Sequence, residues 1–284
     1  MTADQAYRKL RTALAPIAGE AAAYEAKEIL GEVLQLSASE TAMLSFLKKE
    51  ISEEEEKTLA RVLARREARE PMEYILGFAW FYGRRLHVSG DCLIPQADTE
   101  IVCEKLIALL KKGGRFADIC TGSGCIALTA LAETKGTSAV GYDISEGALA
   151  VAEKNADALG LSARFEAKKA DVFDEDFLLS EGIFDLIVSN PPYIETAVIE
   201  TLSPEVQNEP HLALDGGADG LLFYRRLLAV CPRHLKKGGV LLFEIGYDQR
   251  AALAELCEAH GFAYECYRDF GGNDRVFAVY PDSE

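Results

Sequence analysis

The stretch Phe184-Asp185-Leu186-Ile187-Val188-Ser189-Asn190-Pro191-Pro192-Tyr193 is the most informative part of the sequence. The apolar and small residues after Asp185 form the pattern of a strand that is buried on both faces. Two prolines then prevent the strand from continuing. The stretch therefore predicts a central parallel strand that ends at Asn190, on the sheet edge where open α/β folds bind their ligands.

The Asn190–Tyr193 motif combines hydrogen-bond acceptors with a rigid backbone. Proline fixes φ and lacks an N–H, so we expect the carbonyls of Asn190 and Pro191 to be held as unpaired acceptors. With the side-chain oxygen of Asn190 and the ring of Tyr193, they suit an –NH2 group that is held by both hydrogens. A string of these four residues arises by chance in roughly one chain per thousand of this length. We therefore interpret the motif as functional rather than as an ordinary turn.

Composition and length are those of a soluble globular protein with one large or two modest domains. The chain has 284 residues, of which 49% are hydrophobic and 27% charged. No apolar run reaches the roughly 20 residues that span a bilayer, and the first residues lack the layout of a signal peptide. The seven cysteines and four histidines are scattered, so neither a disulfide framework nor a metal site is expected. We expect a cytoplasmic protein that has no membrane segment.

The net charge argues against nucleic acid as a partner. The formal charge is −16, with 11 basic and 14 acidic residues over residues 1–77 and 19 basic and 32 acidic residues in the remainder. Such a surface repels a phosphate backbone, whose neutralisation supplies most non-specific affinity for nucleic acids. No direct binding of nucleic acid is therefore expected.

The sequence divides into a helical part, a connector and an alternating part. Residues 1–70 predict a small helical domain, 71–97 a hairpin linker rich in aromatic residues and glycines, and 98–284 an α/β domain. Alternating strands and helices imply a parallel sheet that is covered on both faces. The last two strands are separated by a tight turn region and should be antiparallel. The expected helices cover residues 3–16, 21–36, 39–49, 53–69, 98–112, 124–134, 146–160, 219–236 and 248–260, and the expected strands cover 115–119, 138–142, 163–169, 186–189, 240–245, 262–267 and 275–280.

A glycine-rich turn, Asp118-Ile119-Cys120-Thr121-Gly122-Ser123-Gly124, follows the first strand of the alternating part. Its glycines let the backbone approach a ligand, and the amides that open the next helix face the same crevice. Asp143 ends the second strand, where an acid takes a ribose diol, and Asp171 follows the third, where an acceptor suits the amine of adenine.

The pattern of this turn also indicates which kind of nucleotide binds. Neither Gly-x-Gly-x-x-Gly nor Gly-Lys-Ser/Thr is present, which favours an adenosyl ligand without polyphosphate. S-adenosylmethionine is therefore the expected cofactor. The predicted cofactor-binding residues are Cys120, Thr121, Gly122, Ser123, Gly124, Asp143, Asp171, Val172 and Asn190.

Over nearly its full length the chain resembles the release-factor glutamine methyltransferases, the HemK or PrmC family. The resemblance implies a class I S-adenosylmethionine-dependent methyltransferase fold, which is Rossmann-like with a seven-stranded, mostly parallel sheet, behind a small N-terminal helical domain. Two positions depart from the family pattern, since Cys120 replaces a glycine and Gln96-Ala97 replaces Arg-Pro. The matching blocks are Leu93-Ile94-Pro95, Asp98-Thr99-Glu100, Thr121-Gly122-Ser123-Gly124, Asn190-Pro191-Pro192-Tyr193, Glu209-Pro210, Ala213-Leu214-Asp215-Gly216-Gly217, Asp219-Gly220-Leu221, Phe243-Glu244-Ile245-Gly246 and Gly271-Gly272-Asn273-Asp274-Arg275.

The resemblance implies methyl transfer to the side-chain amide nitrogen of the glutamine in the Gly-Gly-Gln loop of peptide chain release factors. Asn190, Pro191 and Tyr193 would be catalytic, and together with Pro192 they would form the substrate site. The helical domain would recognise the release factor, and a monomer is expected. A nucleic-acid adenine-N6 methyltransferase is an alternative, because it uses the same motif on a flipped base. A non-catalytic adenosyl-binding module is a further alternative, which only the two departures support.

Overall fold

The computed structural model describes residues 1–110 and 113–281, and its internal contacts divide the chain into two compact units. The first unit contains residues 1–77 and 203–208, and the second contains 78–202 and the chain from 209 on. The segment expected to be a linker is thus shared between the units. Met72 and Ile75 belong to the core of the first unit, whereas Phe81 and Leu86 belong to the core of the second.

The first unit is helical, as the sequence predicts. Three of its helices begin with a capping box at Thr2, Ser37 or Ser52, where the cap side chain and the residue three positions later satisfy each other's backbone N–H. The helix expected over 39–49 is shorter, because the chain turns at Leu44, which is fully buried in the core. The helices are α1 (Ala3–Ala18), α2 (Ala22–Val33), α3 (Ala38–Ala42), α4 (Glu53–Glu67) and α5 (Met72–Leu76).

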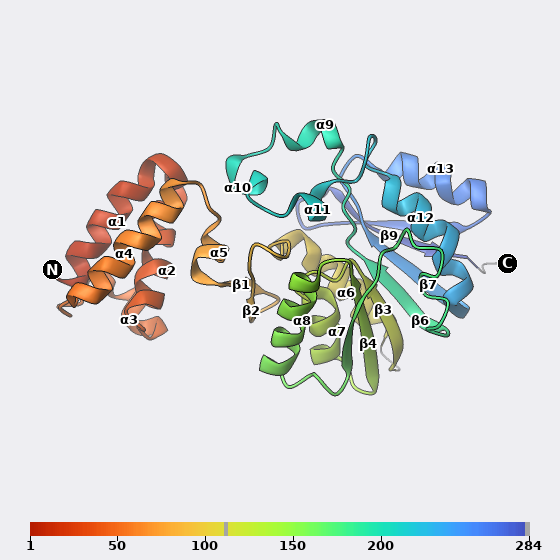
Figure 1. Cartoon of the computed structure of the whole chain (residues 1–284), viewed down its shortest axis with the longest axis horizontal. Coiled ribbons are helices and arrows are strands. Elements are labelled where there is room, and N and C mark those ends of the chain that lie inside the picture. Colours follow the sequence, from red (N-terminus) through yellow and green to blue (C-terminus); the bar gives the residue numbers. More distant parts are fainter. Residues whose placement is uncertain (111–112, 282–284) are drawn as a thin grey trace. The chain divides into compact units, whose positions relative to one another are not determined.

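The second unit is built on a seven-stranded sheet in the order β5-β4-β3-β6-β7-β9-β8 (Figure 1). The strands from β5 to β7 are parallel, and β9 is antiparallel to both of its neighbours. The seven-stranded, mostly parallel sheet and the antiparallel closing pair are therefore confirmed. The strands are β3 (Gly114–Ile119), β4 (Thr137–Asp143), β5 (Phe165–Lys169), β6 (Phe184–Ser189), β7 (Leu235–Glu244), β8 (Ala263–Arg268) and β9 (Asp274–Tyr280).

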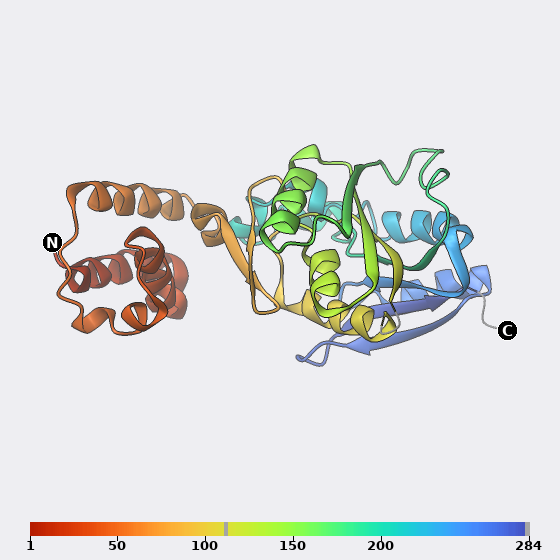
Figure 2. The same cartoon turned by 90° about the horizontal axis from the view of Figure 1, so that it is seen from below.

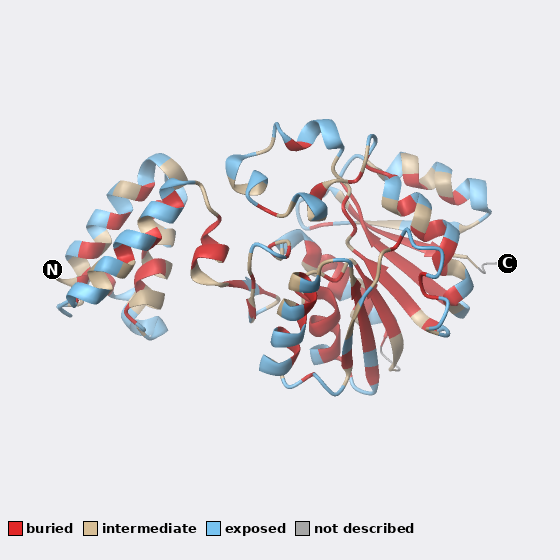
Figure 3. Ribbon diagram, in the orientation of Figure 1, coloured by how far each residue is buried: buried red, intermediate tan, exposed pale blue. Residues whose placement is uncertain are grey.

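Helices cover both faces of this sheet, whose strands β3, β4, β6, β7 and β9 are buried along most of their length (Figures 2 and 3). α6 (Glu100–Leu109), α7 (Cys125–Glu133) and α8 (Glu146–Ala158) pack on one face, and α12 (Leu222–Val230) and α13 (Arg250–His260) pack on the other. The last two residues of the helix expected over 98–112 lie outside the described residues. The helix expected over 219–236 ends at Val230, because Pro232 cannot continue it.

The remaining elements of the second unit are short. β1 (Phe78–Phe81) and β2 (Arg84–His87) form the expected hairpin. The chain after β6, expected to be a loop, contains the one-turn helices α9 (Thr196–Ile199) and α11 (His211–Leu214), and α10 (Pro204–Gln207) lies between them in the first unit. None of the helices in the described ranges has the length and hydropathy that a membrane crossing requires.

Candidate active site

The loop between β3 and α7 has an unusual backbone. Cys120, Gly122 and Gly124 all have positive φ, at 60°, 55° and 78°. A Cβ on Gly124 would lie 3.0 Å from Leu128 and 3.2 Å from Ala152, so glycine at this position lets α7 and α8 pack closely. The sequence Gly-x-Gly therefore forms a tight strand-to-helix turn, as expected.

A buried carboxyl group holds this loop in place by hydrogen bonds. Asp118, at the end of β3, is fully buried and accepts the Thr121 hydroxyl at 2.8 Å and the backbone N–H of Ala127 at 3.2 Å. Burial raises the pKa of Asp118 to about 7, although these hydrogen bonds oppose the shift. Asp118 thus fixes the loop rather than facing a ligand.

Asp143 joins the glycine-rich loop to the loop that follows β4. Its Oδ2 accepts the backbone N–H of Gly122 at 2.9 Å, and its Oδ1 accepts the backbone N–H of Ser145 at 3.0 Å. Burial raises the pKa of Asp143, and the hydrogen bonds from Ser145 and Gly122 act in the opposite direction. Two backbone donors therefore fix the carboxylate in place at the carboxyl end of its strand.

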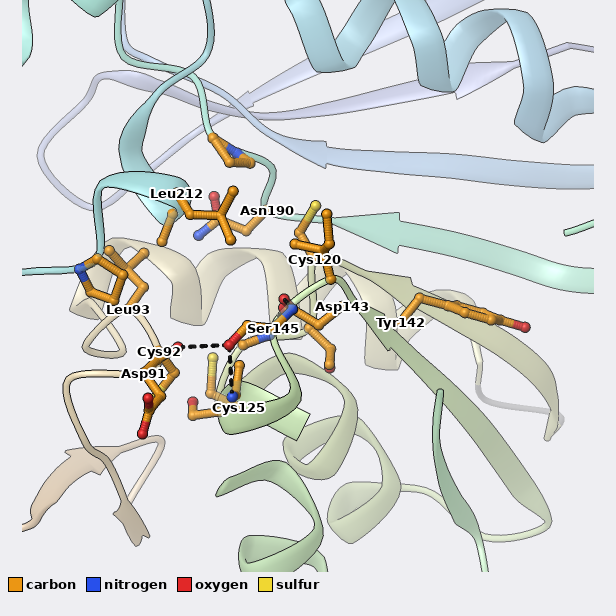
Figure 4. Close-up of a pocket in the computed structure, with 18 of the residues that line it drawn as sticks. Asp91, Cys92, Leu93, Cys120, Cys125, Tyr142, Asp143, Ser145, Asn190 and Leu212 are labelled. Atoms are coloured by element: carbon orange, nitrogen blue, oxygen red, sulfur yellow. Dashed lines mark hydrogen bonds between the residues drawn. The ribbon is translucent and has the colours of Figure 1, made fainter. Parts of the chain in front are cut away.

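A cavity of about 470 Å³ lies where β3, β4, β5 and β6 end (Figure 4). Among the residues that the structure describes, no three His, Cys, Asp or Glu side chains are grouped as metal ligands. Most of the predicted site residues meet at this cavity, whereas Gly124, Pro191 and Tyr193 do not line it. Those that line it are Cys120, Thr121, Gly122, Ser123, Asp143, Asp171, Val172, Asn190 and Pro192.

Asn190 offers an amide group to this cavity (Figure 4). Its side chain is half-buried, and no residue in the described ranges hydrogen-bonds to it. Asp171 differs in this respect, since its Oδ1 accepts the backbone N–H of Phe173 at 2.8 Å. An amide that faces a cavity without a protein partner is available to bind a ligand.

Part of the cavity wall comes from residues outside the predicted set of site residues. The connector from Gly90 to Gln96 lines it, and the Ser145 hydroxyl holds the connector by donating to the Asp91 carbonyl at 3.4 Å (Figure 4). The pair Phe173–Phe223, with ring centroids 5.2 Å apart, and Pro210, Leu212 and Ala213 complete the wall. Among these segments, Leu93-Ile94-Pro95, Glu209-Pro210 and Ala213 belong to the family blocks.

Comparison with known proteins supports the family resemblance seen in the sequence. The profile of the PrmC N-terminal domain matches residues 5–77, and that of the methyltransferase small domain matches residues 97–208. The release factor glutamine methyltransferase of Cereibacter sphaeroides is 39% identical over 98% of both chains. The enzyme of that name from Agrobacterium fabrum is 41% identical over 80% of both, and that from Rhodospirillum rubrum is 44% identical over 88% of this chain and 76% of the relative.

The chain belongs to the release factor glutamine methyltransferase family. Solved structures agree on the fold of this family member. The hMettl16 catalytic domain in complex with MAT2A 3'UTR hairpin 1 covers 84% of both chains with a TM-score of 0.57 and 18% identity. A methyltransferase from Pyrococcus furiosus covers 80% of this chain and 99% of its own, with a TM-score of 0.53 and 18% identity. The expected class I methyltransferase fold is thereby confirmed, and identity this low shows the fold alone.

Several of the family's sequence blocks contact one another next to the Asn-Pro-Pro-Tyr motif of this family member. The Tyr193 hydroxyl donates to Glu244 Oε1 at 3.4 Å, and Tyr193 does not line the cavity. Arg275 binds Asp98 at 3.0 Å and Asp269 at 3.3 Å. Sequence reasoning gave Glu244 and Arg275 no role, because only the fold brings the ends of β7 and β9 next to the motif.

Proposed function

We propose that this protein transfers a methyl group from S-adenosylmethionine to the side-chain amide nitrogen of the glutamine in the Gly-Gly-Gln motif of peptide chain release factors. The observation that carries the proposal is the unpartnered Asn190 amide in a cavity bounded by the glycine-rich loop. The shared name of the similar relatives, release factor glutamine methyltransferase, supports the substrate.

The cavity fits an adenosyl cofactor. Its volume of about 470 Å³ lies within the usual range of small-molecule sites, roughly 300–1,000 Å³. The fixed carboxylate of Asp143 suits the ribose hydroxyls, Asp171 and Val172 suit the adenine, and the loop from Cys120 to Gly124 suits the methionine part. S-adenosylmethionine supplies an electrophilic methyl group on a sulfonium.

The substrate amide needs orientation more than activation by a base. Its nitrogen lone pair is delocalised into the carbonyl, so it is a poor nucleophile. The side-chain oxygen of Asn190 and the carbonyl of Pro191 would accept its two N–H bonds and point the nitrogen at the methyl group. Orientation and preorganised acceptors contribute several kcal/mol to such a step. The N-methylated, protonated amide is very acidic and loses its proton readily.

Pro192 and Tyr193 complete the proposed substrate site in different ways. Pro192 lines the cavity and would contact the alkyl part of the glutamine. Tyr193 does not line the cavity and packs against the core on the side of the sheet that α12 and α13 cover, so it would hold the motif in place.

The helical residues 1–70 are the proposed recognition domain for the release factor. A single glutamine in a loop offers too little surface for selectivity, and a folded substrate requires a second contact area. None of the residues that line the cavity lies in this part of the chain. We propose that the protein acts as a monomer on one release factor at a time.

Labelled S-adenosylmethionine and a purified release factor test the proposed function directly. After incubation with the protein, mass spectrometry should place the methyl group on the glutamine of Gly-Gly-Gln. An adenine-containing oligonucleotide serves as the second substrate, and we expect it to stay unmethylated. Label on adenine and none on the release factor would show that the enzyme is a nucleic-acid methyltransferase instead.

A further inference from the structure

Between the Asn-Pro-Pro-Tyr motif and the cavity-lining residues that begin at Pro210, a short segment of the chain belongs to the helical unit. Residues 203–208, which include α10, have their contacts in the first unit, although the chain on either side belongs to the second. Within the described residues, this is the one piece of the α/β sequence that belongs to the helical unit.

One carboxylate carries most of the polar contacts of this piece. Glu205 Oε1 accepts Arg66 Nη1 at 3.0 Å and Arg69 Nη1 at 3.1 Å. Arg69 also donates to the Ile17 carbonyl at 3.2 Å, and the Asn208 side chain donates to the Arg69 carbonyl at 3.2 Å. Glu205 thus links α10 to residues of α4 and its C-terminal end.

Arg66 makes this link specific. Arg66 is only 5% exposed. Its Nε and Nη2 atoms donate to the carboxylate of Glu25 in α2 at 2.9 and 3.1 Å. Two carboxylates therefore share one buried cation, whose guanidinium group has little contact with water. Loss of one partner from such a group is costly, because the remaining charge stays buried and only partly paired.

The chain segments before and after residues 203–208 lie side by side next to the Asn-Pro-Pro-Tyr motif. The N–H of Ile194 donates to the Leu214 carbonyl at 3.0 Å, and the N–H of Gly216 donates to the Ile194 carbonyl at 2.8 Å. A Cβ on Gly216 would lie 2.6 Å from the Tyr193 Cα, so only glycine permits this approach. The base of the loop is therefore closed against the motif.

The chain segment after residues 203–208 forms part of the cavity wall. Glu209 is buried, and its Oε2 accepts the backbone N–H of Ile94 at 2.9 Å. Pro210, Leu212 and Ala213 then line the cavity. A loop that is fixed at its base and at its middle leaves these wall residues few conformations.

We propose that Glu205 is a positioning residue for methyl transfer: by binding Arg66 and Arg69 it anchors the loop of residues 195–213 in the helical unit and thereby orders the wall at 209–213. This role rests on the proposed function. Glu205 itself does not touch the reacting atoms.

Glu205→Gln tests the proposal, with Glu195→Gln as its matched control. Glu195 lies in the same loop, is exposed, and its side chain makes no hydrogen bond or ion pair with the described residues. In Glu205→Gln, amides of residues 196–202 and 209–213 should exchange with deuterium about tenfold faster or more. The kcat/KM for a short Gly-Gly-Gln peptide should fall by about the same factor, while the Kd of S-adenosylmethionine stays within a few-fold. The control should match the parent in all three measurements.

Two results would overturn the positioning role: unchanged exchange over residues 196–213, or faster exchange with unchanged peptide kinetics. The variant should remain folded, because the Arg66–Glu25 pair is unchanged. Thermal unfolding followed by circular dichroism checks this. A parent protein that methylates neither peptide nor release factor overturns the proposed function, and the positioning role falls with it. The exchange comparison then still decides whether Glu205 holds the loop.

Discussion

Cys120 has a backbone conformation that glycine adopts more easily. Its φ is 60°, and for a residue with a Cβ the left-handed region costs roughly 1–2 kcal/mol. The family pattern has glycine at this position, which agrees with that cost. Against it stands the packing of the thiol on the core of the second unit.

We expect Cys120→Gly to raise the melting temperature by no more than a few degrees and to keep or increase methyl transfer. Relief of backbone strain is partly offset by the greater freedom of glycine in the unfolded chain, worth about 0.5–1 kcal/mol. Thermal unfolding followed by circular dichroism measures the first effect. A clear fall in melting temperature would show that packing of the thiol outweighs the strain.

Asn190→Ala should reduce kcat by a factor on the order of 100 or more while cofactor affinity stays within a few-fold. The amide orients the nucleophile, and loss of one preorganised group at a reacting centre typically has an effect of this size. Kinetics with the release factor and calorimetry with S-adenosylmethionine separate the two quantities. If cofactor binding disappears together with activity, Asn190 is mainly a binding residue.

Asp143→Ala should weaken cofactor binding by roughly tens-fold or more. The substitution removes the proposed ribose contacts, and charge-assisted hydrogen bonds contribute roughly 1.5–3 kcal/mol each. It also leaves the N–H groups of Gly122 and Ser145 without their acceptor. Glu153→Ala, on the exposed side of α8, removes the same charge and should not change the Kd. Equal affinities for both variants would rule out a ribose contact.

At the scale of elements, β7 ends in a buried acid whose ionisation is costly. Glu244 is 2% exposed, and burial raises its pKa to about 7, with Thr99 and Arg275 opposing the shift. Between the ordinary carboxyl pKa and about pH 7, the folded protein keeps a proton that the unfolded chain releases. This group therefore lowers the stability as pH rises through that window, and the penalty stays constant above it.

Glu244→Gln removes this penalty, because the amide does not ionise. Relative to the parent, the free energy of unfolding of the variant should rise between pH 5 and pH 8 by up to about 3 kcal/mol. Urea denaturation of both proteins at the two pH values measures the difference. A difference that is the same at pH 5 and pH 8 means that Glu244 is already ionised at the lower pH.

At the scale of the whole molecule, cofactor binding and recognition of the release factor are expected to lie in different units. The residues that line the cavity all belong to the second unit. A fragment that begins at residue 78 should therefore bind S-adenosylmethionine within a few-fold of the full chain, once circular dichroism shows that it is folded. It should lose most methylation of the intact release factor, because the proposed recognition helices are missing.

The same fragment should methylate the short Gly-Gly-Gln peptide more slowly than the full chain. Without the helices the 203–208 segment has lost its partners, so peptide kcat/KM should fall about as far as in Glu205→Gln. The measurement is the ratio of the two rates, for factor and for peptide, in both proteins. Methylation of the intact factor at the parent rate would refute the recognition role of residues 1–70.

The order of the elements and the place of the cofactor loop could be predicted from the sequence alone, because both depend on local signals. Apolar runs mark the buried strands, the capping boxes at Thr2, Ser37 and Ser52 mark helix starts, and Gly-x-Gly after an apolar strand marks a turn. Since parallel strands present their carboxyl ends at one edge, the convergence of Cys120, Asp143, Asp171 and Asn190 followed as well.

Only the tertiary structure decided which distant segments share a contact. The Tyr193–Glu244 hydrogen bond, the Arg275–Asp98 pair and the place of Glu205 beside Arg66 depend on contacts across long stretches of chain. No local pattern encodes them, because an acid on a one-turn helix has the same sequence signature whether it binds a buried arginine or faces solvent. For Glu205 the physical reason is the burial of Arg66 in the folded chain, where a buried ion needs a partner.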